Sequence, residues 1–268
     1  MKFAHINDYR VEATIGAKGA CPNCGSGLIA KCGEVKINHW AHKGKKSCDP
    51  WWENETEWHR SWKGKFPIAW QEKTQNDDSG EKHIADVETD SGWVIEFQHS
   101  YLKPEERRAR NNFYNKLVWV VDGTRRKTDI SQFKKAIEES TVICEEPLVR
   151  RVLFPEECRL LKEWDNSNSL IFFDFQEVNS TKQIMLWFLY PKISTSETFI
   201  SPFPRGYFIE VLKESKFDEL VKNTIIPNRE ILEKNIQTQL KNRLSSRPSR
   251  LSGFNRYMAR KRRKQRRL

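Results

Sequence analysis

Two short segments decide the fold: Ala85-Asp86-Val87 and, after the polar turn Thr89-Asp90-Ser91-Gly92, the run Val94-Ile95-Glu96-Phe97-Gln98. Side chains alternate between the faces of an extended strand, so Glu96 and Gln98 project away from the core. The turn predicts a hairpin that brings Asp86 close to Glu96. Two carboxylates beside a carboxamide suit a hard divalent cation, and such ions are used to hydrolyse phosphodiesters. The alternative is an ordinary hairpin with a solvated polar face.

The flanking segments give the hairpin a context. A capping-box-like start and a closing Phe66-Pro67 predict a helix over 54–65, and Trp70 to Thr74 reads as a short strand. After the hairpin, Pro104 opens a charged helix to about Asn115. The run 116–121 is apolar without alternation, which indicates a strand covered on both faces. The predicted succession is therefore helix, strand, strand, strand, helix, strand, in an α/β (α+β) domain.

Six short motifs then occur in the order of the competence protein CoiA-like family: Cys21-Pro22-Asn23-Cys24, His39-Trp40-Ala41-His42, Glu57-Trp58-His59, Ala85-Asp86-Val87, Ile95-Glu96-Phe97-Gln98-His99-Ser100 and the strand that contains Trp119. The chain resembles this family over roughly residues 15 to 125. The family is part of the restriction-endonuclease-like, PD-(D/E)xK nuclease superfamily. The resemblance implies a metal-dependent nuclease acting on DNA, in DNA uptake, recombination or phage defence, with Mg2+ or Mn2+ on Asp86 and Glu96 and with a zinc module before it.

The sequence departs from the superfamily pattern at Gln98, which stands where the third strand usually carries a lysine. An amide supplies no charge, so a cation must come from elsewhere. His59 and Lys63 are candidates because they lie four residues apart on one face of the predicted helix. The alternative makes them ordinary surface residues, and His83 and His99 could face the site or only flank it. The missing lysine also leaves open a nuclease-fold protein that binds nucleic acid as an adaptor without cleaving it.

A second set of residues has the spacing of zinc ligands: Cys21, Cys24, His39, His42 and Cys48. A Cys-x-x-Cys turn presents two thiolates to one ion, and a second pair completes a closed structural Zn2+ site. Four of these five suffice. An extended chain at 39–42 would point its two histidines to opposite faces and favour one histidine with Cys48, whereas a knuckle-like turn would allow both. The alternative is a pair of reduced cysteines near unrelated histidines.

Composition predicts a cytoplasmic protein without a membrane span, because the six cysteines are clustered as ligands and the N-terminus has no apolar signal segment. The net charge of +11 resides entirely in residues 241–268, which hold 12 Lys or Arg and no acidic residue. Such a run suits DNA, or RNA, as a polyanion partner. A ribosome- or lipid-seeking tail and a nuclear localisation signal are the alternatives.

These features divide the chain into four parts: a zinc-ribbon-like module at 1–50, a nuclease-like domain at 51–145, a C-terminal α+β module at 146–244, and a disordered basic tail at 245–268. The C-terminal module is the least informative part. Its apolar runs predict a hairpin of Leu170–Phe173 with Ile184–Leu189, a third strand at Tyr207–Leu212, and helices at 213–223 and 229–244. It could contact the substrate, hold a protein partner or only extend the core.

Overall fold

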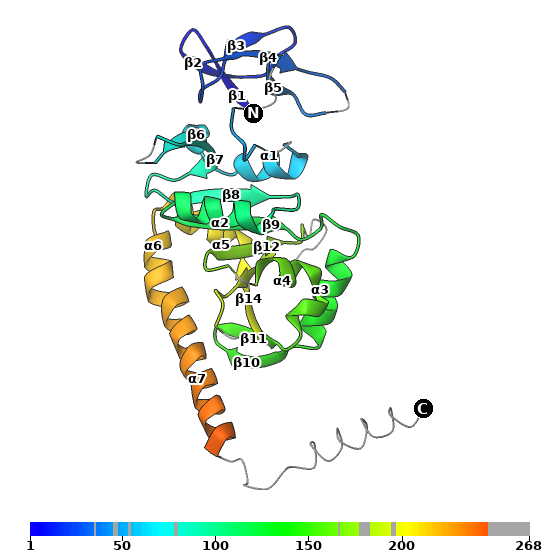
Figure 1. Ribbon diagram of the computed structural model, residues 1–268, viewed down its shortest axis with the longest axis vertical. Helices are drawn as coiled ribbons and strands as arrows, with labels where there is room; N and C mark the ends of the chain where they lie inside the picture. The colour runs from blue at the N-terminus through cyan, green and yellow to red at the C-terminus, as the bar shows by residue number, and fades with distance from the viewer. Residues whose placement is uncertain are drawn as a thin grey trace.

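The computed structural model describes residues 1–34, 36–44, 48–52, 55–77, 80–165, 167–176, 183–193 and 197–245. They form a mixed α+β structure with two sheets, one of five strands and one of nine. The small sheet lies at one end of the molecule, above α1 (Glu57–Lys63), and the large sheet runs through its body (Figure 1). No helix among these residues is long and apolar enough to cross a membrane.

The small sheet is antiparallel, in the order β2-β1-β3-β4-β5. Its strands are β1 (Phe3–Ile6), β2 (Tyr9–Glu12), β3 (Lys18–Ala20), β4 (Gly27–Lys31) and β5 (His39–His42). Its buried core is small and includes Met1, Ala4, Leu28 and Trp40. Because this core buries little apolar surface, it stabilises the folded module only weakly. A bound metal ion could supply the missing stability.

The large sheet has the order β10-β11-β14-β13-β12-β9-β8-β7-β6. Its strands are β6 (Gln71–Asn76), β7 (Lys82–Glu88), β8 (Val94–Gln98), β9 (Leu117–Asp122), β10 (Thr141–Glu145), β11 (Leu148–Val152), β12 (Leu170–Asp174), β13 (Met185–Leu189) and β14 (Thr198–Pro204). Strands β8, β9 and β12 are parallel, and the other pairings are antiparallel.

Short helices cover the two faces of the large sheet. They are α1, α2 (Pro104–Phe113), α3 (Asp129–Glu138), α4 (Arg159–Trp164), α5 (Arg205–Lys213) and α6 (Phe217–Leu220), with 3-10 turns at Ile68–Trp70 and Pro155–Glu157. A π-helical turn at Val221–Ile225 joins α6 to α7 (Ile226–Ser245). Helix α7 extends away from the body of the molecule (Figure 1).

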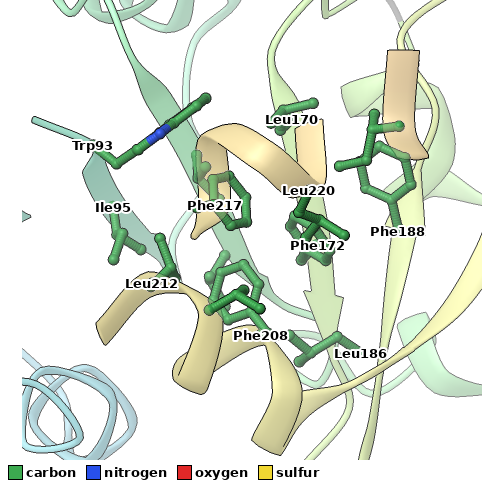
Figure 2. Close-up of a cluster of buried hydrophobic side chains, with 14 of the residues drawn as sticks. Trp93, Ile95, Leu170, Phe172, Leu186, Phe188, Phe208, Leu212, Phe217 and Leu220 are labelled. Atoms are coloured by element: carbon green, nitrogen blue, oxygen red, sulfur yellow. The ribbon is translucent and has the colours of Figure 1, made fainter. Parts of the chain in front are cut away.

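The central strand β9 is buried at every position, as its uninterrupted apolar run predicts. Alternate residues contribute to different cores: Val118 and Val120 face one side, and Trp119 and Val121 face the other. On the first side, Phe208 and Leu212 of α5 and Phe217 of α6 pack against Ile95 of β8 and Phe172 of β12 (Figure 2). The sheet is therefore a layer between two apolar cores.

The predicted succession is present as α1, β6, β7, β8, α2 and β9. The predicted start of the first helix at Asn54 lies outside the described residues, and α1 begins at Glu57 with Thr56 as its N-cap. The hairpin turn ends with Gly92 at φ 80°. The pairs Val87–Ile95 and Glu88–Val94 fix the register that places Asp86 beside Glu96.

The C-terminal segment 146–244 differs from the sequence prediction in two ways. Its strands join the sheet of the segment 51–145, because β12 pairs in parallel with β9. The predicted strand at Tyr207–Leu212 is wrong, since these residues belong to α5. Phe208, Val211 and Leu212 are the buried positions, with the three- and four-residue spacing of a helix face. The strand that follows β12 and β13 in this segment is β14, which pairs with β13.

Candidate metal centre and candidate active site

Four ligand atoms converge in the small sheet, from Cys21, Cys24, His42 and Cys48. All of them lie within 4.8 Å of one another. The Cys21–Cys24 turn lies between β3 and β4, and β5 supplies His42 opposite it. Sγ of Cys24 lies 3.4 Å from Nε2 of His42, and Sγ of Cys21 lies 3.6 Å from Sγ of Cys48. Three thiols and one imidazole are the donor set of a structural zinc site, so these residues fit Zn2+.

The extended strand β5 separates the two candidate histidines. His39 points away from the cluster and bonds through Nδ1 to the carbonyl oxygen of Ile37, at 2.8 Å. One histidine and Cys48 therefore complete the set, as the extended alternative predicts. Burial opposes ionisation of the Cys24 thiol, but hydrogen bonds with Ser26 and His42 outweigh it and lower the pKa to about 6. A thiolate is the form that binds metal.

All five residues predicted for catalysis line one small cavity: Asp86, Glu96, Gln98, His59 and Lys63. The cavity has a volume of about 60 Å³, which is room for a few water molecules or a partly hydrated ion. Its walls come from α1, β7 and β8. The two strands part where the carboxylates lie, and Oδ2 of Asp86 accepts a hydrogen bond of 3.0 Å from the backbone N–H of Phe97. Trp58 and Trp62 pack on Phe97 beneath the cavity.

Lys63 is a buried cation in the wall of this cavity. Its side chain is buried, and Nζ lies 2.6 Å from Glu55, 2.8 Å from Glu72 and 3.7 Å from Asp86. Burial by itself lowers the pKa of a lysine, but Glu72, Asp86 and Glu55 outweigh burial and raise the pKa of Lys63 above its ordinary value. The amine is therefore a fixed positive charge beside Asp86, although it belongs to a helix and not to β8.

Glu72 is a site residue that the sequence analysis missed. It has φ 48° and lies between the paired positions Gln71–Val87 and Lys73–Ala85, opposite Asp86 and in an unchanged register. Its buried carboxylate accepts hydrogen bonds from the backbone N–H groups of Lys2 and Phe3 as well as from Lys63. Despite burial, these donors lower the pKa of Glu72 to about 2. One carboxylate thus joins β1 to Lys63.

Glu96 has a different environment from the other acids. Its Oε2 accepts a hydrogen bond of 2.8 Å from Arg110 of α2, a second residue that the sequence did not indicate. Among the described residues, its Oε1 has no hydrogen-bond partner. Burial outweighs the attraction of Arg110 and raises the pKa of Glu96 to about 8, with Asp86 as a further cause. An unsatisfied buried carboxylate oxygen beside a second carboxylate fits a divalent cation.

His59 lies in the wall of the cavity and also caps its own helix. The N–H of Thr56 and its hydroxyl both lie within bonding distance of Nδ1, at 3.3 and 2.9 Å, and the hydroxyl accepts from the backbone N–H of His59. Nδ1 is therefore an acceptor, and the imidazole proton lies on Nε2. Nε2 of Gln98 bonds to the backbone oxygen and the hydroxyl of Ser100. Both side chains are thus held by residues two or three positions away in the chain.

The segment 48–52 connects the metal centre with the cavity. Cys48 is a ligand, and the next residue, Asp49, bonds to Nδ1 of His83 and to the backbone N–H of Ile84. Trp51 stacks on His83, and its carbonyl oxygen accepts a hydrogen bond of 2.7 Å from Arg110. Arg110 in turn bonds to Glu96. A continuous set of bonds thus leads from a cysteine ligand to a carboxylate of the cavity.

Comparison with known proteins gives a match to one family, described as competence protein CoiA, N-terminal domain, over residues 15–50. No curated protein and no solved structure matches the chain. The matched stretch contains the four converging residues Cys21, Cys24, His42 and Cys48. The match supports a relationship of this chain to the CoiA family, carried by the N-terminal module.

Proposed function

We propose that this protein is a divalent-metal-dependent nuclease that acts on DNA, with a restriction-endonuclease-like core and a structural zinc module. The buried Lys63 carries the proposal, because it brings a positive charge to Asp86 where Gln98 provides none. The succession α1, β6, β7, β8, α2, β9 with β8 parallel to β9 supports the fold assignment. The CoiA relationship supports a role in DNA uptake, recombination or phage defence.

Asp86 and Glu96 would hold Mg2+ or Mn2+, since both line the cavity and Oε1 of Glu96 lacks a partner among the described residues. When bound, such an ion polarises a phosphodiester and acidifies water. Lys63 stabilises negative charge that develops on the phosphate, and preorganised charges of this kind contribute strongly to catalysis. Gln98 orients water or a phosphate oxygen, and His59 donates from Nε2. The cavity is too small for a nucleotide, so the substrate backbone lies across its mouth.

The test is cleavage of single-stranded, duplex and branched DNA by purified protein in Mg2+ or Mn2+. Asp86→Ala and Glu96→Ala should abolish cleavage and leave DNA binding largely intact, because basic groups elsewhere provide the affinity. Metal-dependent cleavage that survives both substitutions would refute the assignment of the site. Binding without cleavage in the wild-type protein would favour the second function below.

A nucleic-acid-binding adaptor without nuclease activity is the second candidate. One observation favours it: Arg110 already compensates Glu96, and Lys63 compensates Asp86, so the acids are paired without a metal ion. In an adaptor of this kind, Mg2+ or Mn2+ would not change the stability of the protein and would not lead to cleavage of DNA. A shift of the melting temperature by Mn2+ that Glu96→Gln removes would argue for the nuclease.

A further inference from the structure

A second polar group lies next to His59 of the cavity, at the carboxyl ends of the parallel strands β8, β9 and β12. His99 follows β8, Asp122 ends β9, and Gln176 lies just after β12. The carboxyl ends of parallel strands are where α/β sheets commonly place their ligands. None of these residues has a role in the proposed function.

Asp122 is fully buried and orients His99. Its Oδ2 accepts from Nδ1 of His99 at 2.7 Å, and its Oδ1 accepts from the N–H and hydroxyl of Thr124 and from the amide of Gln176. Only an ionised carboxylate can accept all of these bonds without a donor of its own. Nδ1 of His99 therefore carries a proton, and Nε2 is the atom left for a ligand.

The His99 side chain is 37% exposed, and its ring centroid lies 6.0 Å from that of His59, which lines the cavity. The two imidazoles differ in a way that separates their roles. Nδ1 of His59 accepts a hydrogen bond in the helix cap, so that imidazole is neutral. Nδ1 of His99 instead lies 2.7 Å from the buried carboxylate of Asp122.

We propose that His99 is the general acid of the cleavage reaction, with Asp122 as its positioning residue. The inference rests on the nuclease activity proposed above. Water attacks phosphorus, the bond from phosphorus to the leaving bridging oxygen breaks, and its electron pair stays on that oxygen. The proton on Nε2 of His99 moves to the oxygen, and His99 regains a proton from solvent. The proton of the attacking water is released to solvent.

The experiment compares two DNA substrates. The first is natural DNA, and in the second a sulfur atom replaces the bridging oxygen that leaves when wild-type protein cleaves the strand. A thiol leaving group has a pKa near 8.5 and departs without protonation. His99→Gln should slow cleavage of the oxygen substrate about 100-fold or more. On the sulfur substrate, in Mn2+, the same variant should retain a rate within about threefold of wild type, since general acid catalysis is the only contribution removed.

His5→Gln, in the small sheet, is the matched control and should change neither rate. Melting temperatures report whether each variant folds. Asp122→Asn should reproduce the selective loss more weakly, because an amide still holds the ring but does not stabilise its charge. Equal losses by His99→Gln on both substrates would overturn the inference while leaving the nuclease activity intact. Absence of any cleavage by wild-type protein would overturn the proposed function and this inference together.

Discussion

At the scale of single residues, the position of a charge matters more than the element that carries it. The amine of Lys63 comes from α1, yet it lies 3.7 Å from Asp86 and is buried among three carboxylates. A lysine at position 98 of β8 would place its amine in the same cavity, which Gln98 lines. Because electrostatic stabilisation depends on where the charge lies, the chain tolerates Gln98 at the strand position.

Lys63→Met should therefore lower the rate of DNA cleavage by about 100- to 1,000-fold, the effect of removing one preorganised charge. Lys65→Met is the matched control. Lys65 lies two residues after Lys63, with its Nζ over the ring of Trp62, and does not line the cavity. Steady-state cleavage rates with melting curves of both variants provide the measurement. An equal loss in the two variants would show that Lys63 has no specific role.

Glu96 should give the metal-free protein an unusual pH dependence. Its folded-state pKa is raised to about 8 by burial, so between pH 4.5 and 8 the folded state binds a proton that the unfolded state has lost. The free energy of unfolding should thus fall as pH rises through this window. Glu72, with a pKa near 2, contributes its change only below pH 4.5.

Glu96→Gln should flatten this fall, because an amide does not titrate. Urea unfolding of wild type and variant at pH 5.5 and 8.5, without added Mg2+ or Mn2+, measures the difference. The assignment of a neutral, buried Glu96 would be contradicted if the free energy of unfolding changed equally in wild type and variant between the two pH values.

At the scale of elements, the segment 48–52 links the two sheets. It supplies Cys48 to the metal centre, and Asp49 holds the backbone N–H of Ile84 at 2.8 Å, two residues before Asp86. Helix α1 reaches the same strand through Lys63, whose Nζ lies 3.7 Å from Asp86. The cavity is therefore assembled by a loop and a helix that both depend on the small sheet, which has little apolar core of its own.

Protein purified without added zinc should contain about one zinc ion per chain, held in a closed four-ligand site. Cys48→Ser should lose this ion and lower the melting temperature, whereas Cys32→Ser, outside the cluster, should retain both. Metal analysis and calorimetry measure these outcomes. Loss of zinc should also speed amide exchange at Ile84, because the segment that holds it is released. A zinc-free protein that melts like wild type would refute the structural site.

At the scale of the whole molecule, charge and chemistry are separated. The chain before residue 241 has 35 basic and 36 acidic residues, and residues 241–268 add 12 basic ones. Helix α7 carries the beginning of this basic segment away from the sheets (Figure 1). Residues 246–268 lie outside the described residues. The excess basic charge and the candidate catalytic cavity thus belong to different parts of the chain.

A chain that ends at Leu240 should bind DNA more weakly and with a flatter salt dependence. Each phosphate contact that is lost reduces the slope of log affinity against log salt by about 0.7 to 0.9. Titrations of full-length and shortened protein at several salt concentrations measure this slope. Cleavage should remain detectable at high protein concentration, because the cavity is unchanged. An unchanged slope would mean that the folded part grips DNA and that the tail has another partner.

The local pattern of the sequence determined the elements around the site and the residues that offered chemistry. Alternation at Ile95 to Gln98, the unbroken apolar run of β9 and the glycine-containing turn predicted the hairpin and the buried strand. Spacing also predicted the cysteine ligands. These features depend on neighbours in the chain, so a sequence displays them directly.

Tertiary structure alone decided the partners of those residues. The extended path of β5 selected His42 over His39, and folding brought Glu72 within 2.8 Å of Lys63. Arg110 met Glu96 because α2 packs on β8, and the helix at Tyr207–Leu212 formed because its apolar positions face one core. Burial and long-range contact set these outcomes. They depend on residues far apart in the sequence, which local propensity does not encode.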